Sequence, residues 1–270
     1  MKYIMRMYQI DSFTDTLFGG NPAAVCILGS EWISDELMMK IAMENNLSET
    51  AFVVEKDNLH HIRWFTPTCE VNLCGHATLA TAHALFNHEN ITDEKIIFHS
   101  KKGELSVTKK DDYLFLDFPV DDIQKIDFFD GLDCFEEKPV ECYIGSDDYM
   151  LVFETQEQIE NLKCNLAKAE KLTNSEGVTC TREGLICTAK GNDVDFVSRY
   201  FGPKVGIPED PVTGSAHTLL APYWAKKLGK NKLDAVQLSA RRGKLSCEVL
   251  GERVIIGGKA VTYLIGEIYL

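Results

Sequence analysis

The sequence predicts an α+β protein made of two similar halves, each with a sheet rolled round one buried helix. Residues 77–86 are apolar on almost every face, and a helix of that kind has to be buried. A second apolar segment begins at Ala216 behind a similar motif. Short strand-like segments precede and follow both helices. Many strands around one buried helix per half give the predicted fold.

The first half begins with a segment that alternates like a strand over residues 1–13. Turn residues at 18–22 lead into a short apolar strand, and Ser34 is a typical N-cap for a helix with an apolar stripe that ends near Asn45 and Asn46. The remaining strands of this half are predicted at 23–28, 51–55, 62–65, 95–99, 104–108 and 113–118.

Pro119, followed by Asp121 and Asp122, marks the predicted boundary between a domain of residues 1–118 and a domain of residues 119–270. In the second half we expect one helix at 156–171, strands at 184–189 and 195–201, and an apolar helix from Ala216 to about Lys227. Pro222 is expected to interrupt or kink that helix, because proline lacks the N–H that a helix needs. Several strands are expected to close the chain.

Three pairs of motifs recur in the same order, which indicates an internal duplication. Arg-Trp-Phe-Thr-Pro from Arg63 is matched by Arg-Tyr-Phe-Gly-Pro from Arg199, Gly-His-Ala from Gly75 by Gly-Ser-Ala from Gly214, and Gly-Glu-Leu-Ser from Gly103 by Gly-Lys-Leu-Ser from Gly243. The spacing between the copies is about half of the chain, far longer than the period of a solenoid repeat. The duplication therefore predicts two similar domains, with two helix N-termini directed at one cleft.

Composition excludes several classes of protein. The formal net charge is −13, which disfavours general binding to nucleic acid or to an anionic membrane. No apolar run is long enough to span a membrane, and the N-terminus is not typical of a signal peptide. The nine cysteines are scattered and form no Cys-x-x-Cys pair, so we expect a reduced, cytoplasmic chain.

The starts of the two apolar helices are the candidate binding sites. The first turn of a helix leaves N–H groups unpaired and carries partial positive charge, which suits an anion. Gly75 and Gly214, each at one of these starts, would allow a ligand to approach the backbone closely. Residues 74–75 and 213–215, including Cys74, Thr213 and Ser215, therefore mark two candidate anion sites.

Three polar residues are candidates for proton transfer. Glu49 lies between an apolar helix and an apolar strand, where burial would raise the pKa of a carboxyl; the alternative is an exposed loop glutamate. His76 is either an acid/base residue or a hydrogen-bond donor to a substrate, or else a cap of the helix that it opens. Asp210 is either a residue of the second site, held in a loop that Pro208 and Pro211 stiffen, or a plain turn residue.

Cys74 has two interpretations of its own. A thiol at a helix N-terminus has a lowered pKa and is reactive, whereas most free cysteines are small buried apolar residues. The matching position in the second copy is Thr213, so a racemase with two opposed thiols would lack its second thiol. No metal site is expected, because neither Cys69 with Cys74 nor His60 with His61 has a second pair at zinc spacing. No dinucleotide fingerprint or phosphate-binding loop occurs.

These motifs resemble the PhzF-like isomerases, within the diaminopimelate epimerase-like fold. The resemblance rests on Asp-Ser-Phe at 11–13 with Gly-Asn-Pro-Ala-Ala-Val at 20–25, and on the motifs at 46–52, 63–67, 74–78 and 209–216, which together cover the whole chain in order. It implies two pseudo-symmetric domains, each a mostly antiparallel sheet rolled into a barrel around a central helix, with the active site between them.

The resemblance also implies a cofactor-free enzyme that acts on a small carboxylate, usually as a homodimer, with neither nucleic acid nor membrane as a partner. By resemblance, Glu49 is the catalytic acid/base, and His76 and Asp210 are its supporting polar residues. The resemblance likewise implies that residues 74–75 and 213–215 bind the substrate. The phenazine enzyme moves a proton between ring carbons of trans-2,3-dihydro-3-hydroxyanthranilate. The motifs do not select a substrate for this chain.

Three hypotheses follow. The first is a cofactor-independent isomerase in which Glu49 takes a proton from one carbon and returns it to another. The second is a one-thiol epimerase or racemase, with Cys74 on one face of the substrate and Glu49 or Asp210 on the other. The third is a protein that binds a small acid without turnover.

Overall fold

The computed structural model describes residues 4–129, 132–172 and 184–270. The chain divides into two compact units. The first unit comprises residues up to Phe118 together with Ile255–Leu270, and the second comprises Pro119–Val254. Within the described residues, no helix is both long and apolar enough to cross a membrane.

The first unit contains a sheet that wraps around one helix. Its strands are β1 (Ile4–Ser12), β2 (Asn21–Ile27), β3 (Glu49–Lys56), β4 (Leu59–Phe65), β5 (Glu70–Val71), β6 (Lys95–Ser100), β7 (Gly103–Lys110), β8 (Tyr113–Pro119), β17 (Arg253–Gly258) and β18 (Ala260–Tyr269). Neighbouring strands follow the path β18, β1, β2, β3, β4, β6, β7, β8 and β17. Along the path from β18 to β8, the pairs β2–β3 and β4–β6 are parallel and the others are antiparallel. The last strand of this path, β17, is followed directly in the chain by β18, which is the first strand of the path. The sheet therefore ends near the strand with which it begins.

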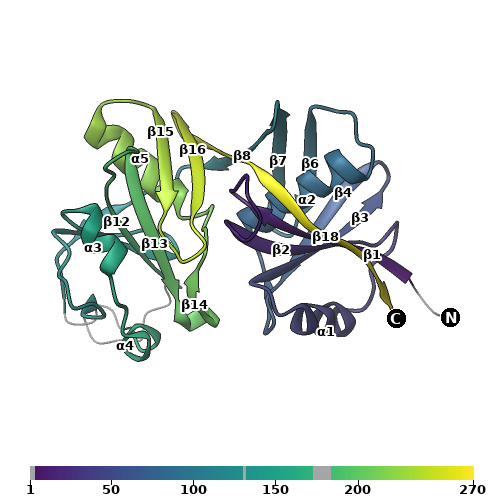
Figure 1. Ribbon diagram of the computed structural model, residues 1–270, viewed down its shortest axis with the longest axis horizontal. Helices are drawn as coiled ribbons and strands as arrows, with labels where there is room; N and C mark the ends of the chain where they lie inside the picture. The colour runs from purple at the N-terminus through teal and green to yellow at the C-terminus, as the bar shows by residue number, and fades with distance from the viewer. Residues whose placement is uncertain (1–3, 130–131, 173–183) are drawn as a thin grey trace. The chain divides into compact units, whose positions relative to one another are not determined.

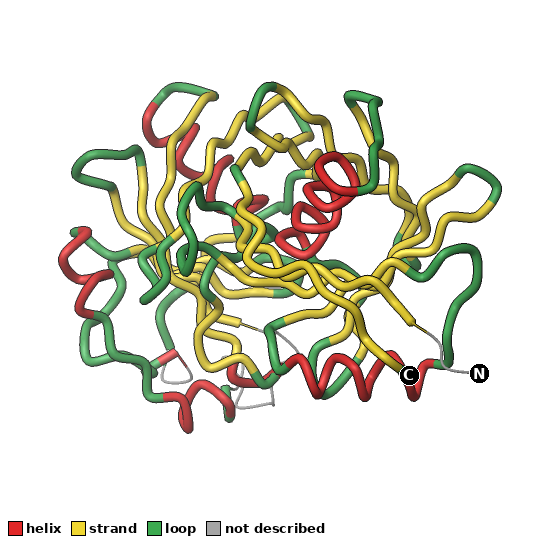
Figure 2. The backbone as a smooth tube through the Cα atoms, turned by 45° about the vertical axis from the view of Figure 1, so that its right-hand side comes forward, coloured by secondary structure: helices red, strands yellow, loops and turns green. Residues whose placement is uncertain are grey.

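Helix α2 (Gly75–His88) is the centre of the first unit. Every residue from Gly75 to Ala82 is buried, and the helix packs against β1, β2, β3, β7 and β18. Figure 1 shows α2 behind β2 and β18, and Figure 2 shows its coil among the strands. Small side chains such as Ala77 and Ala80 let the strands approach it closely. The predicted buried helix is therefore confirmed, and it extends two residues beyond Phe86.

Helix α1 (Asp35–Asn45) covers the outer face of the same sheet. The predicted cap is present, because Ser34 Oγ accepts a hydrogen bond from the N–H of Leu37. The helix ends at Asn46 in the left-handed conformation. Its apolar stripe packs with the outward side chains of β1, β2, β3 and β4: Met38, Ile41 and Ala42 with Met5, Cys26, Leu28, Phe52, Val54 and Phe65.

The second unit repeats this plan around α5 (His217–Leu228). Its remaining elements are β9 (Gln124–Ile126), β10 (Glu141–Ile144), β11 (Asp148–Val152), α3 (Gln156–Asn161), α4 (Leu166–Glu170), β12 (Gly184–Lys190), β13 (Phe196–Gly202), η2 (Pro203–Val205), β14 (Ile207–Asp210), β15 (Lys232–Gln237) and β16 (Gly243–Leu250). The strands pair in the order β9, β10, β11, β12, β13, β15 and β16, with β14 beside β13. Again two pairs are parallel, β11–β12 and β13–β15. Helix α5 runs through Pro222 without a break.

The duplication is visible in side-chain contacts as well as in strand order. Arg63 of β4 forms a two-pronged ion pair with Glu70 of β5, with both N–O distances at 2.7 Å. Arg199 of β13 forms the same pair with Glu209 of β14, at 2.7 and 2.9 Å. The two guanidinium groups also lie over matching rings, Phe65 and Phe201. Pairs of this geometry are among the stronger polar contacts in proteins, and here they close the same hairpin in both units.

Two expectations differ from the structure. The helix expected at 156–171 is two short helices, because α3 ends at Leu162 and Asn165 caps α4 with a hydrogen bond from the N–H of Lys168. The division expected at 118/119 assigned the C-terminal residues to the second domain. Instead, residues 255–270 lie in the first unit, because β18 pairs antiparallel with β1 along its whole length.

Candidate active site

Glu49 is the first residue of β3 and is only 7% exposed. Its place is set by the parallel pairing of β3 with β2, which puts it beside Ala23. The neighbouring Thr50 accepts a hydrogen bond from Asn45 Nδ2 at the end of α1, at 3.1 Å. Glu49 is therefore a buried carboxylate at the start of a strand, and the exposed-loop alternative does not describe it.

His76 lies beside Glu49 and is also buried. Its Nε2 is 3.2 Å from Glu49 Oε2, and Ser12 Oγ donates a hydrogen bond to its carbonyl oxygen at 2.8 Å. Burial lowers the pKa of His76 to about 3. At neutral pH the imidazole is therefore uncharged, so its contact with Glu49 is not an ion pair. A neutral imidazole can donate one hydrogen bond and accept another, and it leaves the charge of the carboxylate uncancelled.

Cys74 completes this group at the N-terminus of α2. It is the N-cap residue and makes no capping hydrogen bond through its side chain, while its carbonyl accepts one from Thr78 Oγ1 at 2.6 Å. Its Sγ lies 3.5 Å from His76 Nδ1. The ligand atoms of Glu49, Cys74 and His76 all lie within 4.8 Å of one another. The first unit thus gathers a carboxylate, an imidazole and a thiol, with Gly75 between the last two.

Asp210 and Thr213 form the corresponding group in the second unit. Asp210 ends β14 and is 5% exposed, and the hydroxyl of Thr213 donates a hydrogen bond to its carboxylate. Gln237, at the end of β15, braces the loop between them. Its Nε2 donates to the carbonyl of Asp210 and its Oε1 accepts from the N–H of Thr213, both at 2.8 Å. The side-chain amide of Gln237 therefore holds both ends of the loop between Asp210 and Thr213.

The start of α5 is held by its own hydrogen bonds. His217 Nδ1 lies 2.9 Å from the carbonyl oxygen of Thr213. Gly214 and Ser215 form the turn that precedes the helix, and their carbonyls accept from the N–H groups of His217 and Thr218. Burial lowers the pKa of His217 to about 4, although the bond to Thr213 opposes that shift. A neutral imidazole thus anchors the turn that contains three of the predicted binding residues.

The two units differ at the position of Glu49. Thr50 pairs with Phe65, and Leu185 pairs with the matching Phe201, so Glu49 corresponds to Gly184. A Cβ atom at position 184 would lie 2.4 Å from the ring of Tyr200, so the space that a side chain would need there is already filled. By the same comparison His76 corresponds to Ser215, Cys74 to Thr213 and Val71 to Asp210. Among the described residues, only the first unit has the buried Glu–His–Cys group.

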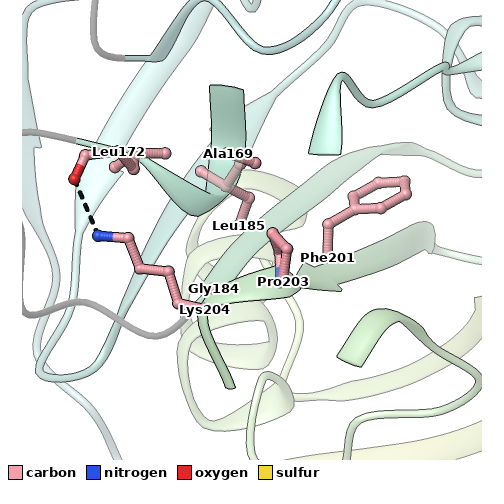
Figure 3. A pocket seen from close by; sticks show the side chains of 7 residues that line it. All are labelled: Ala169, Leu172, Gly184, Leu185, Phe201, Pro203 and Lys204. Carbon is pink, nitrogen blue, oxygen red and sulfur yellow. Dashed lines mark hydrogen bonds between the residues drawn. The ribbon is translucent and has the colours of Figure 1, made fainter. Parts of the chain in front are cut away.

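The small hollow in the second unit is separate from these residues. It is lined by apolar side chains and by Lys204, whose Nζ donates to the carbonyl of Leu172 at 2.9 Å (Figure 3). The other lining residues are Ala169, Leu172, Gly184, Leu185, Phe201 and Pro203. None of the predicted catalytic or binding residues lines it.

Three residues of these groups were not singled out by the sequence. Ser12 lies within the Asp-Ser-Phe motif, and its contact with His76 explains why a serine is useful there. Gln237 and His217 have no such signal, because a glutamine at a strand end and a histidine in an apolar helix are common. Their role depends on contacts between residues that are distant in the chain.

The chain matches the family model described as "Phenazine biosynthesis-like protein" over residues 10–266. It belongs to this family. An uncharacterized isomerase of Pseudomonas aeruginosa is 46% identical over 267 residues, which cover 98% of this chain and 99% of that protein. The crystal structure of a PhzF-family protein from Enterococcus faecalis has a TM-score of 0.93 and 43% identity, covering 99% of this chain and all of that one.

The chain is therefore a PhzF-like isomerase with the α+β fold that its motifs predict: two pseudo-symmetric domains, each a mostly antiparallel sheet rolled around a central helix. A hydroxyproline epimerase from Agrobacterium vitis, with a TM-score of 0.63 and 11% identity, shows that the fold extends to proteins with little sequence in common.

Proposed function

We propose that this isomerase works without a cofactor and moves a proton between two carbons of a small carboxylate, with Glu49 as the acid and base. The observation that supports it is the buried carboxylate of Glu49, 3.2 Å from an imidazole that is neutral at physiological pH. A carboxylate can take a proton from carbon and return it to another carbon, so the bonds balance without any other reagent.

The surroundings of Glu49 suit this chemistry. His76 can hydrogen-bond to the substrate or to Glu49 while remaining uncharged, which leaves the carboxylate available as a base. The first turn of α2, at Gly75 and His76, has N–H groups without intrahelical partners. Such groups stabilise a carboxylate and the negative charge that develops when a neighbouring carbon loses a proton.

We also propose that Asp210 supports the same reaction and that residues 213–215 bind substrate. The support is the bracing of this segment by Gln237 and His217, which holds a carboxylate and a helix start in fixed positions. Preorganised groups of this kind are what a catalytic site requires.

Proton exchange with solvent tests the role of Glu49 even before the natural substrate is known. The enzyme is incubated in D2O with trans-2,3-dihydro-3-hydroxyanthranilate and a panel of small hydroxy and amino acids, and NMR follows loss of C–H signals. For any compound that exchanges, Glu49→Gln should slow the exchange by about 100-fold or more, because it removes the base and keeps the shape.

Glu55→Gln is the matched control, because Glu55 lies on the same strand but is exposed. It should exchange at the wild-type rate. If Glu49→Gln also exchanged at that rate while folded, Glu49 would not be the base.

A one-thiol epimerase is the second candidate, and the 3.5 Å contact between Cys74 Sγ and His76 Nδ1 favours it. The contact holds the thiol in the same buried group as the carboxylate of Glu49. Cys74→Ala separates the two mechanisms. Only a thiol mechanism predicts that this variant loses turnover while it remains folded.

A further inference from the structure

We propose that Glu49, Cys74 and His76 form a binding site for a thiophilic divalent ion of the zinc type, and that the ion would block the isomerase by occupying its base. The sequence gives no sign of such a site, because the ligands do not follow zinc spacing. They come together because β3 begins beside the N-terminus of α2.

The chemistry of the three side chains fits zinc. A thiolate, an imidazole nitrogen and a carboxylate oxygen are the donors that Zn²⁺ binds, and three protein ligands with one open position are typical of a reactive site. Softer donors such as the thiol of Cys74 favour zinc over Mg²⁺ or Ca²⁺, which prefer oxygen ligands. On binding, the thiol of Cys74 releases its proton to solvent and its sulfur bonds to the ion.

The distances fit as well. With metal bonds of about 2.0 to 2.3 Å, the donors around a tetrahedral zinc lie roughly 3.3 to 3.8 Å apart. His76 Nε2 is 3.2 Å from Glu49 Oε2, and His76 Nδ1 is 3.5 Å from Cys74 Sγ. These two distances involve different nitrogens of the ring, whereas one ion binds one nitrogen. One nitrogen already lies within 4.8 Å of both other donors, so the separations around an ion have to shorten by up to about 1 Å.

Burial distinguishes this group from an exposed cysteine. The side chains of His76 and Glu49 are 5% and 10% exposed, so protein donors would replace most of the water around a bound ion. The thiol at Cys69 lies five residues before Cys74 but is exposed and belongs to no such cluster among the described residues. It provides a matched control for non-specific binding to a thiol.

Cobalt(II) provides a test that does not need turnover. The whole protein, reduced and free of metal, is titrated with Co²⁺ and its absorption spectrum is recorded. We expect a thiolate-to-metal charge-transfer band that saturates at one ion per chain and disappears when Zn²⁺ is added. Cys74→Ser should abolish the band and Cys69→Ser should leave it unchanged. Glu49→Gln should weaken binding by roughly 100-fold, the scale seen when a metal site loses an important group.

Thermal unfolding gives a second measurement, since an ion that binds only the folded state raises Tm. Zn²⁺ should raise the Tm of the wild type and of Cys69→Ser, and at the same concentration should raise that of Glu49→Gln by much less. A wild-type titration without a charge-transfer band, or a band that survives Cys74→Ser, would overturn the proposal. Neither outcome bears on Glu49 as the base, which the exchange experiment tests separately.

Discussion

Burial decides the charge of the histidines at both helix starts. The pKa of His217 falls to about 4, below the usual value of about 6.5, because the folded protein removes the ring from water. The unfolded chain therefore binds a proton that the folded chain does not, at any pH between these values. The stability that follows from this difference is fully present above pH 6.5 and is lost as the pH falls toward 4.

We expect the free energy of unfolding to fall by about 2 kcal/mol between pH 7.5 and pH 5 through His217 alone. Urea unfolding of His217→Gln at the two pH values should show a correspondingly smaller loss than the wild type. The control is His99→Gln, at a half-buried position on β6, which should keep the wild-type loss. Equal losses in His217→Gln and the wild type would contradict the prediction.

Gln237 shows how one buried amide can fix a loop. Replacing it by leucine removes one buried hydrogen bond from the Thr213 N–H and one from the Asp210 carbonyl. We expect Gln237→Leu to cost about 1 to 3 kcal/mol in denaturant unfolding, since each hydrogen bond contributes about 0.5 to 1.5 kcal/mol. Gln124→Leu, at an exposed position on β9, should change stability by no more than about 0.5 kcal/mol.

At the scale of elements, an ion pair between an arginine and a glutamate joins the two strands of the equivalent hairpin in each unit. Arg199 also donates to the carbonyls of Ile159 and Leu162, so it ties α3 to β13, whereas Arg63 pairs with Asp35 at the start of α1. Lysine keeps the charge but cannot make the two-pronged contact. Each of these arginines therefore connects elements within its own unit.

We expect Arg199→Lys to speed amide hydrogen exchange in β13, β14 and α3, and Arg63→Lys to speed it in β4, β5 and α1. Each variant is the control for the other. Exchange that rises equally in both units after either substitution would show that these arginines do not act locally.

At the scale of the whole chain, the polypeptide passes from the first unit to the second after β8 and returns to the first unit at β17. β9 follows β8 and pairs with β10, while β18 follows β17 and pairs with β1. A chain that ends at Gly258 lacks β18, so β1 loses one of its two neighbours.

We expect such a truncated chain to lose hydrogen-exchange protection in β1 and α2, and to keep it in β12 and α5. Removing only Tyr269 and Leu270 is the control and should have little effect, because most of the pairing remains. Equal loss of protection in both units after the longer truncation would contradict the assignment of β18 to the first unit.

Much of this organisation could be predicted from the sequence, because it depends on local patterns. The apolar faces of residues 77–86, the Ser34 cap and the repeated Arg and Gly motifs are all local signals, and the structure confirms the elements that they predict. One helix is expected at 156–171, but Arg199 binds carbonyls at the end of α3 and Asn165 caps a second helix. The contact from Arg199 comes from a distant strand and is not visible in the sequence of this segment.

The sequence by itself determined the family, the duplicated α+β plan and the polar residues at the two helix starts. The tertiary structure alone decided that Glu49 is buried against His76 and Cys74, that Gln237 and His217 brace the loop of Asp210, and that β18 belongs to the first unit. The physical reason is that burial and proximity between distant strands and helices arise only when the sheets close around α2 and α5. Charge state and reactivity follow from that burial, whereas helix and strand formation follow from neighbouring residues.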